Sequence, residues 1–291
     1  MLKMLPWPST YLPGDNMKNR RYGWVCLPFF LASTGVLAQS TDTGSPPSDR
    51  SLAAYRQQPG IDENIWKALG GPGIASAKGK HAKLPRKWDF AARSIPSANP
   101  DKVTLLRVEI RLTPFDEGFV QVETKIEGES STSTTTELSW LGLISVQSQS
   151  RSNSQISGTL TGSTSIETAT TRKLEKIRAL ELQLDALKPG YRWSHDYAIV
   201  AEVSSKSSLT SRQNKLTINV KQDCEVSQGG AATSLSSSLT GNFFSIICRS
   251  STDPDGLREL LYLDDYAFFI PKRSKTKPSD LEYKLIGVTA Q

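Results

Sequence analysis

The chain has 291 residues, with 35 Lys and Arg against 29 Asp and Glu, and its net charge is +6 at pH 7. Half of this excess lies in the first 38 residues; the remainder has 31 basic and 28 acidic residues. The most basic stretch, Lys78–Lys87, is short and is interpreted as a solvated linker, so we expect no nucleic-acid partner. The length is enough to bury a core of one or two domains.

The segment Met17–Ala38 has the three parts of a secretory signal peptide. Its start is positively charged through Lys18, Arg20 and Arg21. An apolar run follows at Val25–Leu37, shorter than the roughly 20 residues that a membrane-spanning helix needs. The small residue Ala38 predicts cleavage before Gln39. We therefore expect an exported protein, located in the periplasm or outside a bacterial cell.

The chain upstream of this segment does not fit a signal peptide, because residues 1–16 hold three prolines and a turn-like Pro-Gly-Asp-Asn. They are interpreted as a non-native extension of a protein that starts at Met17. The chain has no Asn-x-Ser/Thr acceptor site, which favours a bacterial envelope over a eukaryotic secretory pathway. The predicted organisation is then a signal peptide at 17–38, a Pro/Gly-rich lead-in at 39–100, and a β-rich domain at 101–291 with a possible sub-boundary near 171–190.

One short helix is predicted in the lead-in. Asp62 can cap its start, and a Gly-Gly-Pro sequence after Leu69 ends it. Ile65, Trp66 and Leu69 then share one apolar face, which we expect to dock on the main domain.

From Val103 the sequence alternates between apolar and polar residues. One run places four apolar residues on the same side: Leu106, Val108, Ile110 and Leu112. A turn-like segment at 113–118 separates it from a second alternating run that ends at Glu127. This pattern predicts a half-buried β-hairpin.

Later segments repeat the β pattern. Of the 42 residues at 130–171, 22 are Ser or Thr, and they surround an apolar stretch, Leu138–Val146, predicted to be one strand. The segment 172–187 fits either a helix or a strand, and its second half favours a strand. Further strands are predicted around 193–203 and 216–220, with a last apolar strand at Tyr262–Ile270. The expected fold is mainly β, an antiparallel β-sandwich of one or two related β-rich domains with few short helices.

The cysteine count predicts one disulfide. Cys26 leaves with the signal peptide, so Cys224 and Cys248 remain as an even pair in an exported chain. Each shares the apolar parity of its strand, which suits a buried cross-link.

No motif assigns catalytic, cofactor-binding or metal-binding residues. His195 is the sole candidate general base, and no Gly-x-Ser-x-Gly sequence accompanies it. Asp264 and Asp265 are adjacent in a predicted strand and would face opposite sides. The stretch Gly71–Lys80 lacks the spacing of a phosphate-binding loop, since Ile74 stands where its first glycine should be.

Three functions remain open. The first is a non-catalytic binding or envelope component whose partner is an envelope protein, a glycan or a membrane surface. In the second, the Ser/Thr-rich segment 130–171 resembles, in composition, the membrane hairpins of aerolysin-type pore-forming proteins. That resemblance implies a tip at Leu138–Val146 and a barrel wall at Ile156–Ile166. The third is a hydrolase that uses His195.

Overall fold

The computed structural model describes residues 52–57, 61–70, 77, 79–115, 117–158, 162–207, 210–251, 253 and 255–289, with side chains left out at 156–164. The predicted signal peptide and its predicted cleavage site at Ala38 and Gln39 lie outside these residues. Within them, no helix is long and apolar enough to cross a membrane.

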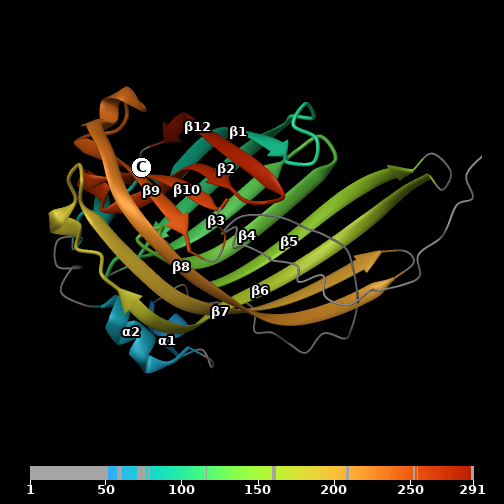
Figure 1. The fold of residues 1–291 in the computed structure, drawn as a ribbon, viewed down its shortest axis with the longest axis horizontal. Helices are drawn as coiled ribbons and strands as arrows, with labels where there is room; N and C mark the ends of the chain where they lie inside the picture. Colours follow the sequence, from blue (N-terminus) through green and yellow to red (C-terminus); the bar gives the residue numbers. More distant parts are fainter. Residues whose placement is uncertain are drawn as a thin grey trace, which may run out of the picture.

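Twelve antiparallel strands form a closed barrel (Figure 1). The strands are β1 (Lys87–Pro96), β2 (Thr104–Pro114), β3 (Phe119–Glu127), β4 (Ser131–Trp140), β5 (Ile144–Gly158), β6 (Gly162–Leu180), β7 (Arg192–Ser207), β8 (Ser211–Ala231), β9 (Asn242–Ser250), β10 (Leu257–Leu263), β11 (Phe268–Lys275) and β12 (Ser279–Thr289). Each strand pairs with its neighbours in the sequence, and β1 pairs with β12 from Lys87↔Thr289 to Pro96↔Ser279. The pairing of the first and last strands closes the barrel.

The predicted β-sandwich is therefore wrong, although the prediction of a mainly β chain with few helices is confirmed. Alternation shows that a strand has one buried face, and both a sandwich and a barrel satisfy that condition. Closure depends on β1 meeting β12, two strands that are far apart in the chain and that the alternation pattern did not reveal. The strand β1 itself lies in the segment expected to be a lead-in.

Along the strands of the barrel, apolar residues face inward and charged residues face outward, as the alternating sequence predicts. Val108 and Ile110 of β2 point into the core, and Glu109 between them pairs with Lys87 on the outer side at 2.7 Å. On β7 and β8, Glu202 and Lys215 make a similar outward pair at 2.9 Å. The barrel thus places apolar side chains inside and ion pairs outside, and the predicted hairpin at 103–127 is confirmed as β2 and β3.

Two helices close an opening in the wall. Strands β5 and β6 pair only as far as Gln147↔Lys173, although both continue beyond that point. Helix α2 (Glu63–Leu69) contacts β6, while its Trp66 packs on Phe119 of β3 with ring centroids 5.4 Å apart. Helix α1 (Leu52–Arg56) lies beside it (Figure 1). The predicted helix is confirmed, including its cap, since the Asp62 carboxylate accepts the N–H of Asn64 at 2.7 Å.

A second opening separates β11 from β12, which pair only between Arg273↔Glu282 and Lys275↔Asp280. The 3-10 turn η2 (His81–Lys83) packs at the tip of the β10–β11 hairpin, where the His81 Nε2 donates to the carbonyl of Ala267 at 3.0 Å. Leu84, which follows η2, is buried in the core beside Trp88. The segment before β1 therefore completes the barrel at two places.

The β10–β11 hairpin is buried on both faces. Leu261 and Ile270 belong to one core cluster, and Tyr262 and Phe269 belong to the other. The predicted single strand Tyr262–Ile270 is thus a hairpin, with the 3-10 turn η5 (Asp264–Tyr266) at its end.

Two other strand predictions also change. Leu138–Val146 reverses direction at Leu141 and Gly142, both at positive φ, and becomes the buried turn between β4 and β5. In 172–187, the first part is strand β6 and the second contains the 3-10 turn η3 (Leu184–Ala186).

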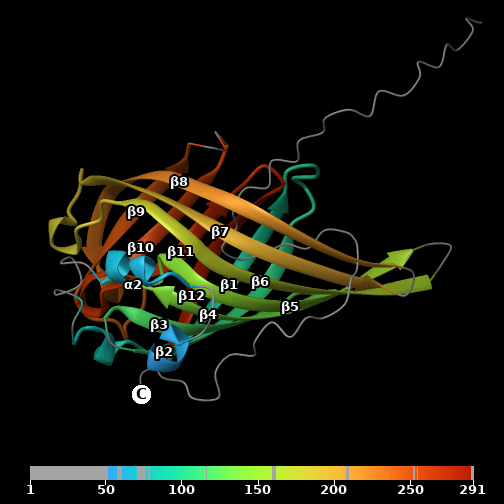
Figure 2. The ribbon, with the colours of Figure 1, turned by 90° about the horizontal axis from the view of Figure 1, so that it is seen from below.

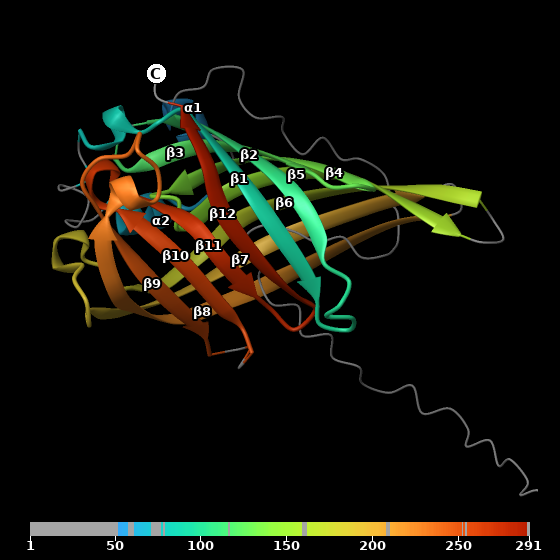
Figure 3. The same ribbon diagram turned by 90° about the horizontal axis from the view of Figure 1, so that it is seen from above.

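Strands β5 to β8 extend beyond the rest of the barrel (Figures 2 and 3). Their mutual pairing reaches Gly158↔Gly162 and Lys206↔Ser211, whereas β4 stops opposite Ser154 and β9 stops opposite Gln222. We call the distal parts of these four strands, with the part of β8 that β9 does not cover, the projecting sheet; it comprises residues 149–158, 162–171, 202–207 and 211–221, of which 149–154 still pair with β4.

Candidate functional site

A buried polar cluster lies on the inward face of the barrel. Glu137 of β4 is followed across the sheet by Ser148 of β5 and Arg172 of β6. Burial raises the pKa of the Glu137 carboxyl to about 7, and the Ser145 hydroxyl and the guanidinium groups of Arg258 and Arg172 act in the opposite direction. The cluster therefore brings one carboxyl and two cations together in a low-dielectric environment.

His195 lies in the same interior but is completely buried. Its Nε2 is 3.0 Å from the side-chain oxygen of Gln222, and its ring stacks on Tyr197 with centroids 5.7 Å apart. Burial lowers the pKa of His195 to about 4, so the imidazole is neutral at pH 7 and donates from Nε2 to Gln222. Such a ring resembles a structural histidine more than a general base, which must reach a substrate.

The predicted disulfide is present. Cys224 of β8 and Cys248 of β9 are directly paired residues with Cα atoms 4.0 Å apart, and both are buried. The Cys224 sulfur is 3.9 Å from the Nδ1 of His195, so the cross-link packs beside the imidazole. The parity argument thus identified the residues that meet.

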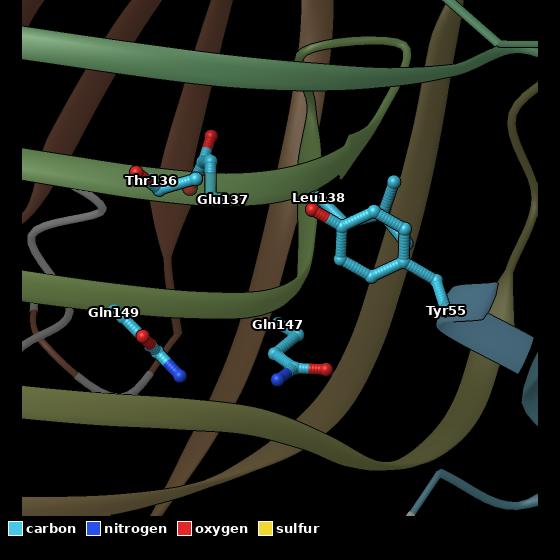
Figure 4. A pocket seen from close by; sticks show the side chains of 6 residues that line it. All are labelled: Tyr55, Thr136, Glu137, Leu138, Gln147 and Gln149. Carbon is cyan, nitrogen blue, oxygen red and sulfur yellow. The ribbon is translucent and has the colours of Figure 1, made fainter. Parts of the chain in front are cut away.

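A small pocket lies where α1 covers the outer side of β3 to β5 (Figure 4). Its lining residues are Tyr55, Thr136, Glu137, Leu138, Gln147 and Gln149. The Tyr55 hydroxyl donates to Gln121 at 3.2 Å, and the amide of Gln121 donates to Glu123 at 2.9 Å. The pocket admits little more than a water molecule, and its polar groups chiefly hold α1 on the wall.

The remaining candidate residues are held apart. Asp264 pairs with Lys80 at 3.0 Å, while Asp265 accepts a hydrogen bond from the Thr240 hydroxyl at 2.7 Å. They lie in the turn η5 rather than in a strand, and they serve different partners. In the described part of the chain, no three His, Cys, Asp or Glu side chains come together in a group that could hold a metal ion.

One face of the projecting sheet mixes polar and apolar side chains, and the other carries charged and polar ones. The face continuous with the barrel interior carries Ser150, Thr170 and Val203 in one cross-strand row. The opposite face carries charges, including Arg151 and Lys206, both exposed. Two side-chain hydrogen bonds link β5 of the projecting sheet to the strands beside it. Thr135 of β4 donates to Ser150 of β5 at 3.1 Å, and Ser165 of β6 donates to Asn153 of β5 at 2.8 Å.

One margin of the projecting sheet has no strand beside it among the described residues. From Ser211 to Lys221, β8 pairs with β7, and its pairing with β9 begins only at Gln222. Sequence reasoning identified a strand at 216–220 but not its exposed edge, because an edge is a property of the whole sheet.

Comparisons with protein-family models, with curated proteins and with solved structures found no match.

Proposed function

We propose that the protein is an exported, non-catalytic binding component of a bacterial envelope, periplasmic or extracellular, and that the projecting sheet is its binding surface. The observation that carries this proposal is the extension of β5 to β8 beyond the strands that flank them. Apart from Ile218 and Val220 at its base, the projecting sheet exposes backbone and side chains outside the core, and such a surface is available to a partner.

The state of the buried ionisable groups supports a role without catalysis. His195 has no exposed surface, and its ring is occupied by Gln222 and Tyr197. Glu137 is buried, and the two small cavities that it lines, one under Tyr55 and one beside Trp88 and Phe90, are too small for a substrate. These contacts favour a structural role for both, and a hydrolase that uses His195 has less support.

Export is supported by two features. The disulfide Cys224–Cys248 is of the kind that persists in oxidising compartments. The segment Met17–Ala38 has the composition of a signal peptide.

The pore-forming alternative also has less support. Its proposed tip, Leu138–Val146, is buried in the core at the end of the barrel away from the projecting sheet. In the projecting part of β5, Arg151 and Asn153 alternate with Ser152 and Ser154, so neither face is apolar. A strand that faces lipid needs one apolar face.

Photo-crosslinking in intact cells tests the proposal. A photoreactive amino acid would replace Arg151 or Lys206 on the projecting sheet, and Lys125 or Lys284 on the barrel wall as controls; all four are exposed. We expect adducts with an envelope molecule from the first pair only. Adducts from both pairs alike, or from neither, would contradict the proposal, as would retention of the protein in the cytoplasm on fractionation.

Dye-filled liposomes separate the pore alternative. The proposed function predicts no dye release at micromolar protein. Dye release together with detergent-resistant oligomers would instead support the pore-forming alternative. For the hydrolase alternative, activity that disappears in His195→Ala would be required.

A further inference from the structure

The edge of β8 between Ser211 and Lys221 points to a specific mode of binding. We propose that it accepts an extended, acidic segment of a partner protein as an added β-strand. This inference rests on the proposed function and names the partner class for the projecting sheet.

The geometry of the edge defines the length of the segment. The β8–β7 ladder runs from Glu225 to Ser211 without a register shift, and the β8–β9 ladder ends at Gln222↔Ser250. Beyond that point Ser251 donates its N–H to the carbonyl of Lys221 at 3.1 Å, which ends the ladder. About ten residues of β8 remain paired on one side, an edge roughly 33 Å long.

This edge has few of the features that normally block strand addition. Proteins protect edges with prolines, bulges and lysines that project over the margin. The segment 211–221 contains no proline, and the register shift of β8 lies elsewhere, between Val226 and Gln228. The central lysine, Lys215, is held on the outer face by its ion pair with Glu202 of β7. Alternate backbone groups along the edge thus face outward and can pair with an extended chain.

The inward side chains next to the edge call for apolar partners. Leu216 and Ile218 are partly buried on the inward face, and Ile218 packs against the core cluster around Val220. A strand added beside β8 would place every second side chain along this row and cover it further. The incoming segment should therefore have apolar residues at alternate positions.

The charges on the edge select against a second copy and for an acidic segment. Between positions 211 and 222 the strand carries Arg212, Lys215 and Lys221 and no acidic residue. Two such strands side by side would bring like charges together, which is destabilising across a β-ladder. Lys215 and Lys221 share the outward face, so Glu or Asp at the outward positions of an added strand would complement them. Arg212, in contrast, lies on the face of Leu216 and Ile218.

A peptide probe tests this inference on the full-length mature protein. The probe alternates Val and Glu over about nine residues and carries a fluorescent label, and its control has Lys in place of Glu. We expect saturable binding of the Val/Glu peptide by fluorescence anisotropy and no binding of the Val/Lys peptide. Hydrogen exchange with the bound Val/Glu peptide should slow the amides of 211–221 and leave those of β2 and β3 unchanged.

Variants locate the binding to the edge. The double change Lys215→Glu and Lys221→Glu should weaken binding by about tenfold or more, whereas Lys125→Glu on β3, a matched surface lysine in an ion pair, should leave it unchanged. Thr217→Pro and Ile218→Pro are compared as a pair, because one of the two adjacent amides faces the open edge. The substitution that removes the outward-facing amide should abolish binding while the protein still folds.

Four results would overturn the inference: equal binding of both peptides, no binding of either, protection outside β8, or a dimer of the protein joined along this edge. If the proline variants do not fold, the test is still made on the wild-type protein, by whether the bound Val/Glu peptide slows amide exchange at 211–221. Failure here is distinguishable from failure of the proposed function, since crosslinks from Arg151 would still identify the projecting sheet as a binding surface that works in another way.

Discussion

The backbone N–H of Phe269 donates a 2.8 Å hydrogen bond to the carbonyl of Leu141. These residues lie on the β10–β11 hairpin and in the β4–β5 turn, so the bond joins two parts of the wall that are not neighbours in the barrel order. The guanidinium of Arg258 reinforces the junction by donating to the carbonyl of Leu143 at 3.2 Å. This junction keeps the β4–β5 turn in the core, where sequence reasoning expected an apolar strand.

The first prediction concerns Gly142, which has φ +74° in the β4–β5 turn. A Cβ at this position would overlap the backbone oxygen of Phe269 and the ring of Phe268. Gly142→Ala should therefore lower the free energy of unfolding by about 2–4 kcal/mol in urea titrations. Gly190→Ala is the matched control, because Gly190 has φ +87° and open space around its Cβ position, and it should cost only about 1 kcal/mol. Equal losses would show that the junction is unimportant.

The second prediction follows from the raised pKa of Glu137. Because this pKa rises from 4.5 to about 7, the folded state keeps a proton that the unfolded state releases between these values. The contribution of Glu137 is full below pH 4.5 and is lost as the pH rises through 7, by up to about 3 kcal/mol. Glu137→Gln imitates the protonated carboxyl, so its free energy of unfolding should fall less between pH 5 and pH 8 than that of the wild type. Parallel pH profiles of the two proteins would contradict this.

The third prediction concerns His195 and has the opposite sign. Its pKa is lowered from 6.5 to about 4, so the unfolded state takes up a proton that the folded state does not. The contribution of the neutral imidazole is full above pH 6.5 and is lost as the pH falls towards 4. His195→Asn should therefore lose less stability than the wild type between pH 6.5 and pH 4.5, whatever its stability at pH 7. Unfolding titrations at both pH values measure the difference, and a steeper loss in the variant would refute it.

The fourth prediction concerns the disulfide. Cys224 and Cys248 close a loop with a sequence separation of 24, and the loop-entropy estimate for such a cross-link is about 3 kcal/mol. The double variant Cys224→Ala and Cys248→Ala should lose stability of this order. The unfolding curve of this double variant should not change when a reductant is added. The wild type should lose stability in reductant, once the reductant gains access to the buried disulfide and reduces it. Two free thiols in the oxidised wild-type protein, counted by mass spectrometry after alkylation, would refute the pairing.

The fifth prediction tests the helix that fills the opening between β5 and β6. Trp66 is buried against Phe119, with Arg56 stacked over its ring at 5.5 Å. Trp66→Ala should cost about 3–5 kcal/mol and should speed hydrogen exchange in β5 near Ile144. Asp62→Ala removes only the helix cap and should cost about 1 kcal/mol. If Trp66→Ala lowered the free energy of unfolding no more than Asp62→Ala, the packing of α2 would contribute little to the stability of the barrel.

Local patterns predicted the elements that depend on neighbouring residues. The β2–β3 hairpin follows from alternation, and α2 follows from a cap, an apolar face and a glycine stop. The disulfide follows from parity, since Cys224 and Cys248 each share the apolar face of a strand. All three require only that one face of a strand or helix be buried.

The remaining features depend on contacts between distant parts of the chain. Closure requires Lys87 to meet Thr289, and the alternation pattern cannot specify which strand end meets which. The buried cluster was missed because Glu137 and Arg172 look like ordinary surface charges in a Ser/Thr-rich tract. The signal available was the position of Glu137 directly before an apolar run, which becomes a buried turn.

The barrel closes through its first and last strands, and this sets the order in which the protein can fold. While β12 is still being synthesised, β1 lacks one of its two neighbours, and only the local hairpins can form. Strand pairing between chain ends is slow because the intervening chain must be ordered first. An incomplete barrel would also expose the apolar row of β1, including Trp88 and Phe90, to solvent and to other chains. The protein should therefore depend on chaperones that hold the unfinished barrel until β12 has been synthesised.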